Sequence, residues 1–178
     1  GIGITGMMPH MGWMGGEVQS PERLARFTVA VANELRRNQN HPSVLMWGTS
    51  GNMFGGVQDP LLIGTRDASE AARLRRSPHM VEPVKRAELG INAIKKLDPS
   101  RPVFIHHGGA SGDVYTLNHY LNMIPLQERE EYLSHYAEHG EMPLWFVEFG
   151  TPFYATMMRG RNNYGNAEKT ETQGNPCS

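Results

Sequence analysis

The sequence of 178 residues holds one cysteine, Cys177, which lies in a polar C-terminal stretch and has no partner for an internal disulfide. A single cysteine leaves the redox compartment undetermined. Apolar runs are short, and none approaches the roughly 20 residues of a membrane span. The sequence shows no signal-peptide pattern, which says little because it begins at Gly1 without an initiator methionine. We therefore expect a soluble protein with no membrane partner, and its compartment is open, with export compatible with the sequence.

An excess of charge of either sign is missing as well, since 17 basic residues stand against 18 acidic ones. Without a basic face, the chain has no electrostatic signature of a nucleic-acid partner. The sequence begins at Gly1 without an initiator methionine and reads as a strand from its first residues. We expect it to be a piece of a longer protein.

Short apolar runs alternate with helical patterns, which indicates βα units and a parallel sheet. The predicted strands cover residues 1–8, 44–47, 102–106, 114–120 and 144–149. The predicted helices begin at Ser20-Pro21, where an N-cap precedes a proline, and cover 84–98 and 126–140, with a short helix at 68–76. The run 44–47 is apolar throughout, as expected of a strand covered on both faces. Five strands in this order fit an open doubly wound sheet or part of an eight-stranded barrel, which needs about 250 residues when complete.

Residues 39–52, which read QNHPSVLMWGTSGN, resemble the acid/base strand of glycoside hydrolase family 2, a family of β-galactosidases, β-glucuronidases and β-mannosidases. Residues 113–120 resemble the sixth barrel strand of that family, and residues 143–150 resemble its seventh. The resemblance implies an α/β fold, namely an incomplete (β/α)8 TIM barrel with roughly strands three to seven in residues 1–158. Residues 159–178 are expected to be a polar, flexible tail.

Retaining glycosidases use two carboxyl groups about 5 Å apart, one as nucleophile and one as acid and base. Glu148 ends the apolar run 143–147 and matches the nucleophile of the family, although a structural glutamate that accepts loop amides would fit the same pattern. Asn52 matches the asparagine that binds the sugar 2-hydroxyl in relatives, and an asparagine in a glycine-rich loop can also cap a turn.

Position 53 departs from the family, which has the acid/base glutamate where this chain has Met53. A thioether neither donates nor accepts a proton in this chemistry, so Met53 is expected to line the sugar pocket as an apolar filler. Asp59, His106 and His107 are alternative sources of the proton, and histidine has a suitable pKa for general acid catalysis. Each of them also suits a loop position, and the sequence does not choose among them.

The resemblance also gives roles to the end of the strand at 113–120. Tyr120 matches the tyrosine that hydrogen-bonds the nucleophile in relatives, while a tyrosine packed under the strand end is the structural alternative. Asn118 and His119 are expected substrate contacts. His135 and His139 are four residues apart on a predicted helix, but they lack the His-Glu pairing of zinc proteases, and we expect a solvated helix face with no metal site.

Two functions follow from these residues. The first is a retaining hydrolase of O-glycosidic bonds in β-linked hexosides or hexuronides, with Glu148 as nucleophile, a missing or relocated acid, and no cofactor. The second is a non-catalytic carbohydrate-binding barrel that keeps Asn52, Tyr120 and Glu148 as ligand contacts; a fragment with no independent function is a third, weaker reading. In either of the first two the partner is a carbohydrate, and the remaining strands must come from absent sequence or another chain, because open sheet edges favour aggregation.

Overall fold

The computed structural model describes residues 2–9, 20–49, 56–120 and 125–149. In chain order the elements are β1 (Ile4–Met7), α1 (Pro21–Asn38), β2 (Val44–Thr49), α2 (Asp67–Arg76), η2 (Pro78–Met80), α3 (Val81–Leu97), β3 (Val103–Ile105), β4 (Tyr115–Asn118), α4 (Leu126–Glu131), α5 (Ser134–His139) and β5 (Leu144–Glu148).

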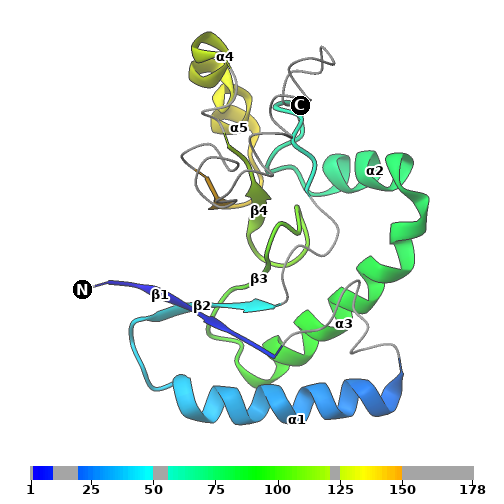
Figure 1. Ribbon diagram of the computed structural model, residues 1–178, viewed down its shortest axis with the longest axis vertical. Helices are drawn as coiled ribbons and strands as arrows, with labels where there is room; N and C mark the ends of the chain where they lie inside the picture. The colour runs from blue at the N-terminus through cyan, green and yellow to red at the C-terminus, as the bar shows by residue number, and fades with distance from the viewer. Residues whose placement is uncertain (1, 10–19, 50–55, 121–124, 150–178) are drawn as a thin grey trace, which may run out of the picture.

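The strands form two separate parallel groups, a three-stranded sheet in the order β1-β2-β3 and a pair β4-β5 (Figure 1). Residues 106–114, between β3 and β4, contain no helix. Two isolated antiparallel bridges, Phe104 with Gly112 and Gly109 with Thr116, tie this connection to the strands on either side. The part of the chain that the structure describes is thus a partial α/β domain with parallel strands and not a closed barrel, as the sequence predicted.

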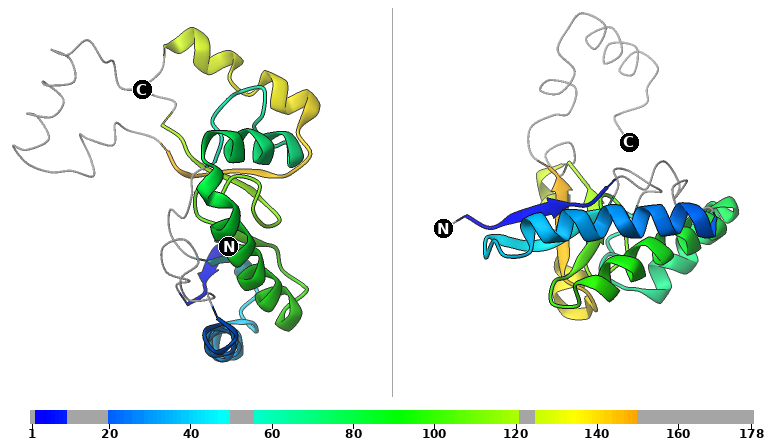
Figure 2. Two further views of the ribbon diagram at one scale, coloured as in Figure 1. Left: turned by 90° about the vertical axis from the view of Figure 1, so that its right-hand side faces the viewer. Right: turned by 90° about the horizontal axis from the view of Figure 1, so that it is seen from below.

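Helices α1 and α3 lie side by side along the three-stranded sheet (Figures 1 and 2). The predicted start of α1 is confirmed, because Pro21 is its first residue and the Ser20 hydroxyl accepts a hydrogen bond from the Arg23 amide at 3.3 Å. The helix buries Phe27 and Val31 at its centre, and these side chains join one hydrophobic core with α3 and the sheet.

Trp47 is the largest side chain of this first core and is fully buried. Its indole Nε1 donates to Oδ2 of Asp98 at 2.8 Å, which satisfies the polar end of the ring. Gly6 of β1 faces the ring so closely that an added Cβ would lie 2.2 Å from Trp47 Cζ3. Gly6 thus serves the packing of β1 on β2.

The expectation that the second strand is covered on both faces is wrong only near its start. Val44 and Trp47 are buried, but Leu45 between them is 57% exposed. From Trp47 to Thr49 every residue of β2 is buried, although successive side chains of a strand point to opposite faces of the sheet. A strand from the middle of a barrel reads as apolar even where the rest of the barrel is not described.

A second core surrounds β4 and β5 at the end of the molecule opposite α1 (Figure 1). The single helix predicted for residues 126–140 is wrong, because the chain forms two short helices, α4 and α5, that break at Tyr132. The Tyr132 side chain is buried in the second core, and its hydroxyl donates to the Gln58 carbonyl at 2.7 Å. Gly140 ends α5 in an extended conformation, with φ −65° and ψ 126°. Among the described helices, none combines the length and apolar character needed to span a membrane.

Candidate active site

Polar side chains gather where β3, β4 and β5 end. His106 follows β3, Tyr120 follows β4, and Glu148 is the last residue of β5. Strands of a βα fold present the loops at their carboxyl ends to one face, which is where such folds place ligands. The topology therefore brings three residues that are distant in the sequence to one edge.

Glu148 is the centre of this group. Its Oε1 lies 2.8 Å from Nε2 of His106, and its Oε2 accepts a hydrogen bond from the Tyr120 hydroxyl. Burial alone would raise the pKa of Glu148, but hydrogen bonds from Tyr120, His106 and Asn118 and the charge on His106 outweigh burial and hold this pKa below its usual value. The carboxylate is consequently ionised at neutral pH.

The pKa of Tyr120 shifts in the opposite direction to that of Glu148. Burial, the hydrogen bond to Glu148 and the negative charge of that carboxylate raise the pKa of Tyr120 to about 12. The phenol therefore keeps its proton and donates to Glu148 throughout the neutral range. The structure thus brings Tyr120 to Glu148, and the role of this pair in catalysis remains a prediction.

Asn118 and His107 form a second layer beside Glu148. The backbone N–H of Asn118 donates to Nδ1 of His107 at 2.8 Å, so the His107 ring serves as an acceptor. Burial, followed by the neighbouring charge of His106, lowers the pKa of His107 and favours the neutral ring. His107 itself has a φ of 53°, which turns the chain sharply directly after His106.

His119 points into different surroundings. Its ring stacks on Tyr132, with 4.4 Å between the ring centroids, and lies 6.0 Å from the Phe146 ring. Burial lowers the pKa of His119. The structure thus places this ring among aromatic side chains of the second core, and its use as a substrate contact stays a prediction.

Asn52 and Met53 lie outside the described residues. The described chain on either side of them leaves β2 at Thr49 and resumes at Gly56, which packs on β4 so tightly that an added Cβ would lie 2.4 Å from Leu117 Cδ2. Gln58 Nε2 then donates to the Asn118 carbonyl at 3.0 Å. The flanks of the Asn52-Met53 segment therefore lie at the end of β2 and beside β4.

Sequence reasoning undervalued two residues. It left His106 as one of several alternatives, although this side chain is a direct partner of Glu148. It also passed over Arg73 of α2, a fully buried cation that binds the loop after β3. The doubled histidine at a strand end was the available signal for the first residue, whereas nothing in the pattern of α2 distinguished Arg73 from its neighbours Arg75 and Arg76.

Within the described ranges, no three His, Cys, Asp or Glu side chains are arranged to hold a metal ion.

The model of the family "Glycosyl hydrolases family 2, TIM barrel domain" matches residues 5–174. The chain belongs to this family. The matched region extends past residue 158, where the sequence predicts a polar tail, and residues 159–178 lie outside the described structure.

Two solved family 2 enzymes are similar to this family 2 chain. One is the β-galacturonidase from Eisenbergiella tayi bound to galacturonate, with 16% identity over 75% of this chain and 22% of that chain, at a TM-score of 0.47. The other is the β-D-glucuronidase of Dictyoglomus thermophilum, with 23% identity over 73% of this chain and 21% of that chain, at a TM-score of 0.41. The family 2 chain thus spans about a fifth of the length of these structures. A comparison with curated proteins gives no match.

Proposed function

We propose that the protein containing this family 2 chain cleaves β-linked hexosides or hexuronides with retention of configuration, and that Glu148 is its nucleophile. The observation that carries the proposal is the contact of both Glu148 oxygens with donors, His106 and Tyr120, at the carboxyl edge of the strands. These donors lower the pKa of Glu148, and an ionised carboxylate is what nucleophilic attack requires.

In the first step, a carboxylate oxygen of Glu148 bonds to the anomeric carbon while the bond from that carbon to the leaving-group oxygen breaks. The electron pair of the broken bond stays on the departing oxygen. Water then attacks the anomeric carbon of the glycosyl ester and loses a proton to bulk solvent, which releases the sugar and returns the carboxylate. Hydrogen bonds from Tyr120 and His106 orient Glu148 for both steps.

The described residues of this site offer no side chain that is free to protonate the leaving group. Met53 stands where the family has its acid. Nε2 of His106 is engaged with Glu148, and Nδ1 of His107 already accepts the Asn118 amide. Asp59 is exposed, and its Oδ1 accepts the amide of Leu61 in its own turn. These contacts favour a site without a dedicated acid, which needs leaving groups that depart unprotonated.

An aryl glycoside with a good leaving group tests the proposal, because its departure needs little acid assistance. In the full-length protein we expect a burst of aryl alcohol that matches the enzyme concentration, followed by a slow steady state. Glu148→Gln should abolish the burst and retain sugar binding. A steady state without a burst that is unaffected by Glu148→Gln would contradict a nucleophilic role for Glu148.

The alternative is a carbohydrate-binding barrel without catalysis, and Met53 in place of the acid favours it. Met53→Glu separates the two functions. A glycosidase that lacks only its acid should gain activity on substrates with poor leaving groups when the carboxyl group returns. Sugar binding with neither a burst nor such a gain would establish the binding protein instead.

A further inference from the structure

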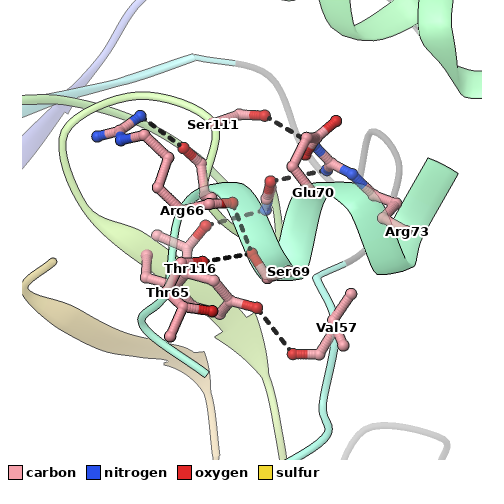
Figure 3. Close-up of polar contacts among 11 residues, drawn as sticks. Val57, Thr65, Arg66, Ser69, Glu70, Arg73, Ser111 and Thr116 are labelled. Atoms are coloured by element: carbon pink, nitrogen blue, oxygen red, sulfur yellow. Dashed lines mark hydrogen bonds and ion pairs between the residues drawn. The ribbon is translucent and has the colours of Figure 1, made fainter. Parts of the chain in front are cut away.

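Arg73 is the one charged side chain among the described residues that is fully buried, at 1% exposure. A buried guanidinium is costly unless its donors are matched. Here Nη1 donates to the Gly108 carbonyl at 2.9 Å, and Nη2 donates to the Ser111 hydroxyl at 3.2 Å and forms an ion pair with Glu70 of the same helix (Figure 3). The fork of Arg73 thus joins α2 to the loop that follows β3.

This loop begins with His106. Its next residues are fixed on two sides, because the Gly108 amide donates to Thr116 Oγ1 at 2.9 Å while the Gly108 carbonyl accepts from Arg73. Gly109 adopts a φ of 60°, and an added Cβ there would lie 3.1 Å from the Gly56 Cα atom. The loop therefore has little room to shift while Arg73 holds it.

A second arginine binds the same loop from the surface. Arg66 donates to the carbonyls of Ala110 and Gly112, each at 3.2 Å. Arg66 is exposed, whereas Arg73 is buried. The two carbonyls that accept from Arg66 come later in the loop than Gly108. The pair allows a general effect on loop stability to be separated from a specific effect on His106.

We propose that Arg73 is a positioning residue that holds the loop after β3 so that His106 stays within hydrogen-bond distance of Glu148. This inference rests on the proposed function for its catalytic consequence only, because the placement of His106 is measurable without turnover. Arg73 is buried away from the surface, and it acts through the Gly108 carbonyl, two residues after His106.

The test uses Arg73→Met, Arg73→Lys and, as the matched control, Arg66→Met in the full-length protein. With ¹⁵N-labelled histidine, the Nε2 resonance of His106 reports its hydrogen bond to Glu148. We expect this resonance to move toward that of an exposed histidine in Arg73→Met and to stay unchanged in Arg66→Met. In Arg73→Lys, the ammonium cannot reach Gly108 and Ser111 with the fixed geometry of a guanidinium, so an intermediate shift is expected.

The kinetic readout is the burst phase with an activated aryl glycoside. Misplacement of a catalytic group by about 1 Å can cost on the order of 100-fold in rate, so Arg73→Met should slow the burst by roughly 10- to 100-fold with little change in KM. The acid limb of its pH profile should move to higher pH, and Arg66→Met should reproduce neither effect at a comparable loss of thermal stability.

Wild-type His106 resonances in both Arg73 variants would overturn the inference, even if the proteins melt at lower temperature. Where Arg73→Met does not fold, Arg73→Lys decides, because a His106 resonance identical to that of the wild type contradicts the positioning role. If the full-length protein shows no burst at all, the proposed glycosidase fails while the resonance still decides the role of Arg73.

Discussion

Nε2 of His106 lies 2.8 Å from Oε1 of Glu148, although 42 residues separate them in the sequence. His106 follows β3 and Glu148 ends β5, with β4 between them in chain order. The contact therefore depends on the arrangement of the two strand groups, and it places the His106 imidazole against the carboxylate that we propose as nucleophile.

Removal of this ring should change the ionisation of Glu148. His106→Ala deletes a hydrogen bond and a positive charge that lower the pKa of Glu148, so this pKa should rise. A hydrogen bond to a charged group contributes about 1.5–3 kcal/mol, which corresponds to a shift of roughly one to two pH units in the acid limb of the burst rate. His79→Ala, at an exposed position, should leave the profile unchanged. An identical acid limb in His106→Ala would show that the contact does not tune Glu148.

Tyr120→Phe removes the donor to the other oxygen of Glu148 while it keeps the ring. Because the Tyr120 hydrogen bond lowers the pKa of Glu148, its loss should also move the acid limb of the burst rate to higher pH, by about one unit. Tyr136→Phe is the matched control, since the Tyr136 hydroxyl donates to the Met142 carbonyl at 3.0 Å in the second core. A shift of the acid limb in the control as large as in Tyr120→Phe would contradict the explanation.

Asp98 should make the stability of the first core depend on acid. Burial alone would raise its pKa, but hydrogen bonds from Ser100, Trp47 and Arg101 outweigh burial and lower the pKa of Asp98 to about 2. A lowered pKa stabilises the fold above the ordinary value near 3.8, and this stability is lost as the pH falls toward 2. The shift corresponds to about 2 kcal/mol in the free energy of unfolding.

Asp98→Asn should therefore destabilise the protein by about 2 kcal/mol at neutral pH and flatten the fall in stability between the two pKa values. Urea denaturation at several pH values measures both effects. Asp67→Asn, at an exposed position in the first turn of α2, should change stability by less than about 1 kcal/mol. Equal pH dependence in the wild type and Asp98→Asn would contradict the prediction.

Gly6 should not tolerate a side chain. An alanine Cβ would lie 2.2 Å from the ring of Trp47, which is fully buried in the first core. We expect Gly6→Ala to lower the free energy of unfolding by about 1–3 kcal/mol. At Gly3, an added Cβ meets the end of the exposed Leu45 side chain, so Gly3→Ala should cost much less. Equal melting temperatures for the two variants would show that β1 adapts.

Much of the fold was predictable because its elements depend on local signals. Ser20 and Pro21 fix the start of α1, and the spacing of Phe27 and Val31 identifies its buried face. The break at Tyr132 was not predictable, since it depends on a hydrogen bond to Gln58, which lies far away in the sequence. The exposure of Leu45 was missed for a similar reason. An apolar residue indicates burial in the complete domain, whereas the described residues form only part of that domain.

The candidate site was predictable where a motif carried it. Glu148 and Tyr120 were named from the resemblance of residues 113–120 and 143–150 to the family, and they are in contact in the structure. His106 could not be chosen from the sequence, because its role depends on its distance to Glu148, which ends a strand two strands later in the chain. Arg73 could not be found at all, since an arginine in a helix rich in arginine reads as a solvated side chain until its burial is known.

The separation of the strands into two groups has a mechanical consequence. His106 belongs to the group with the first core, while Tyr120 and Glu148 belong to the group with the second, and no continuous ladder joins β3 to β4. A sugar seated at this edge would contact both halves and make their unfolding cooperative, since a ligand that binds only the joined state stabilises it. A bound sugar would then hold the two strand groups together.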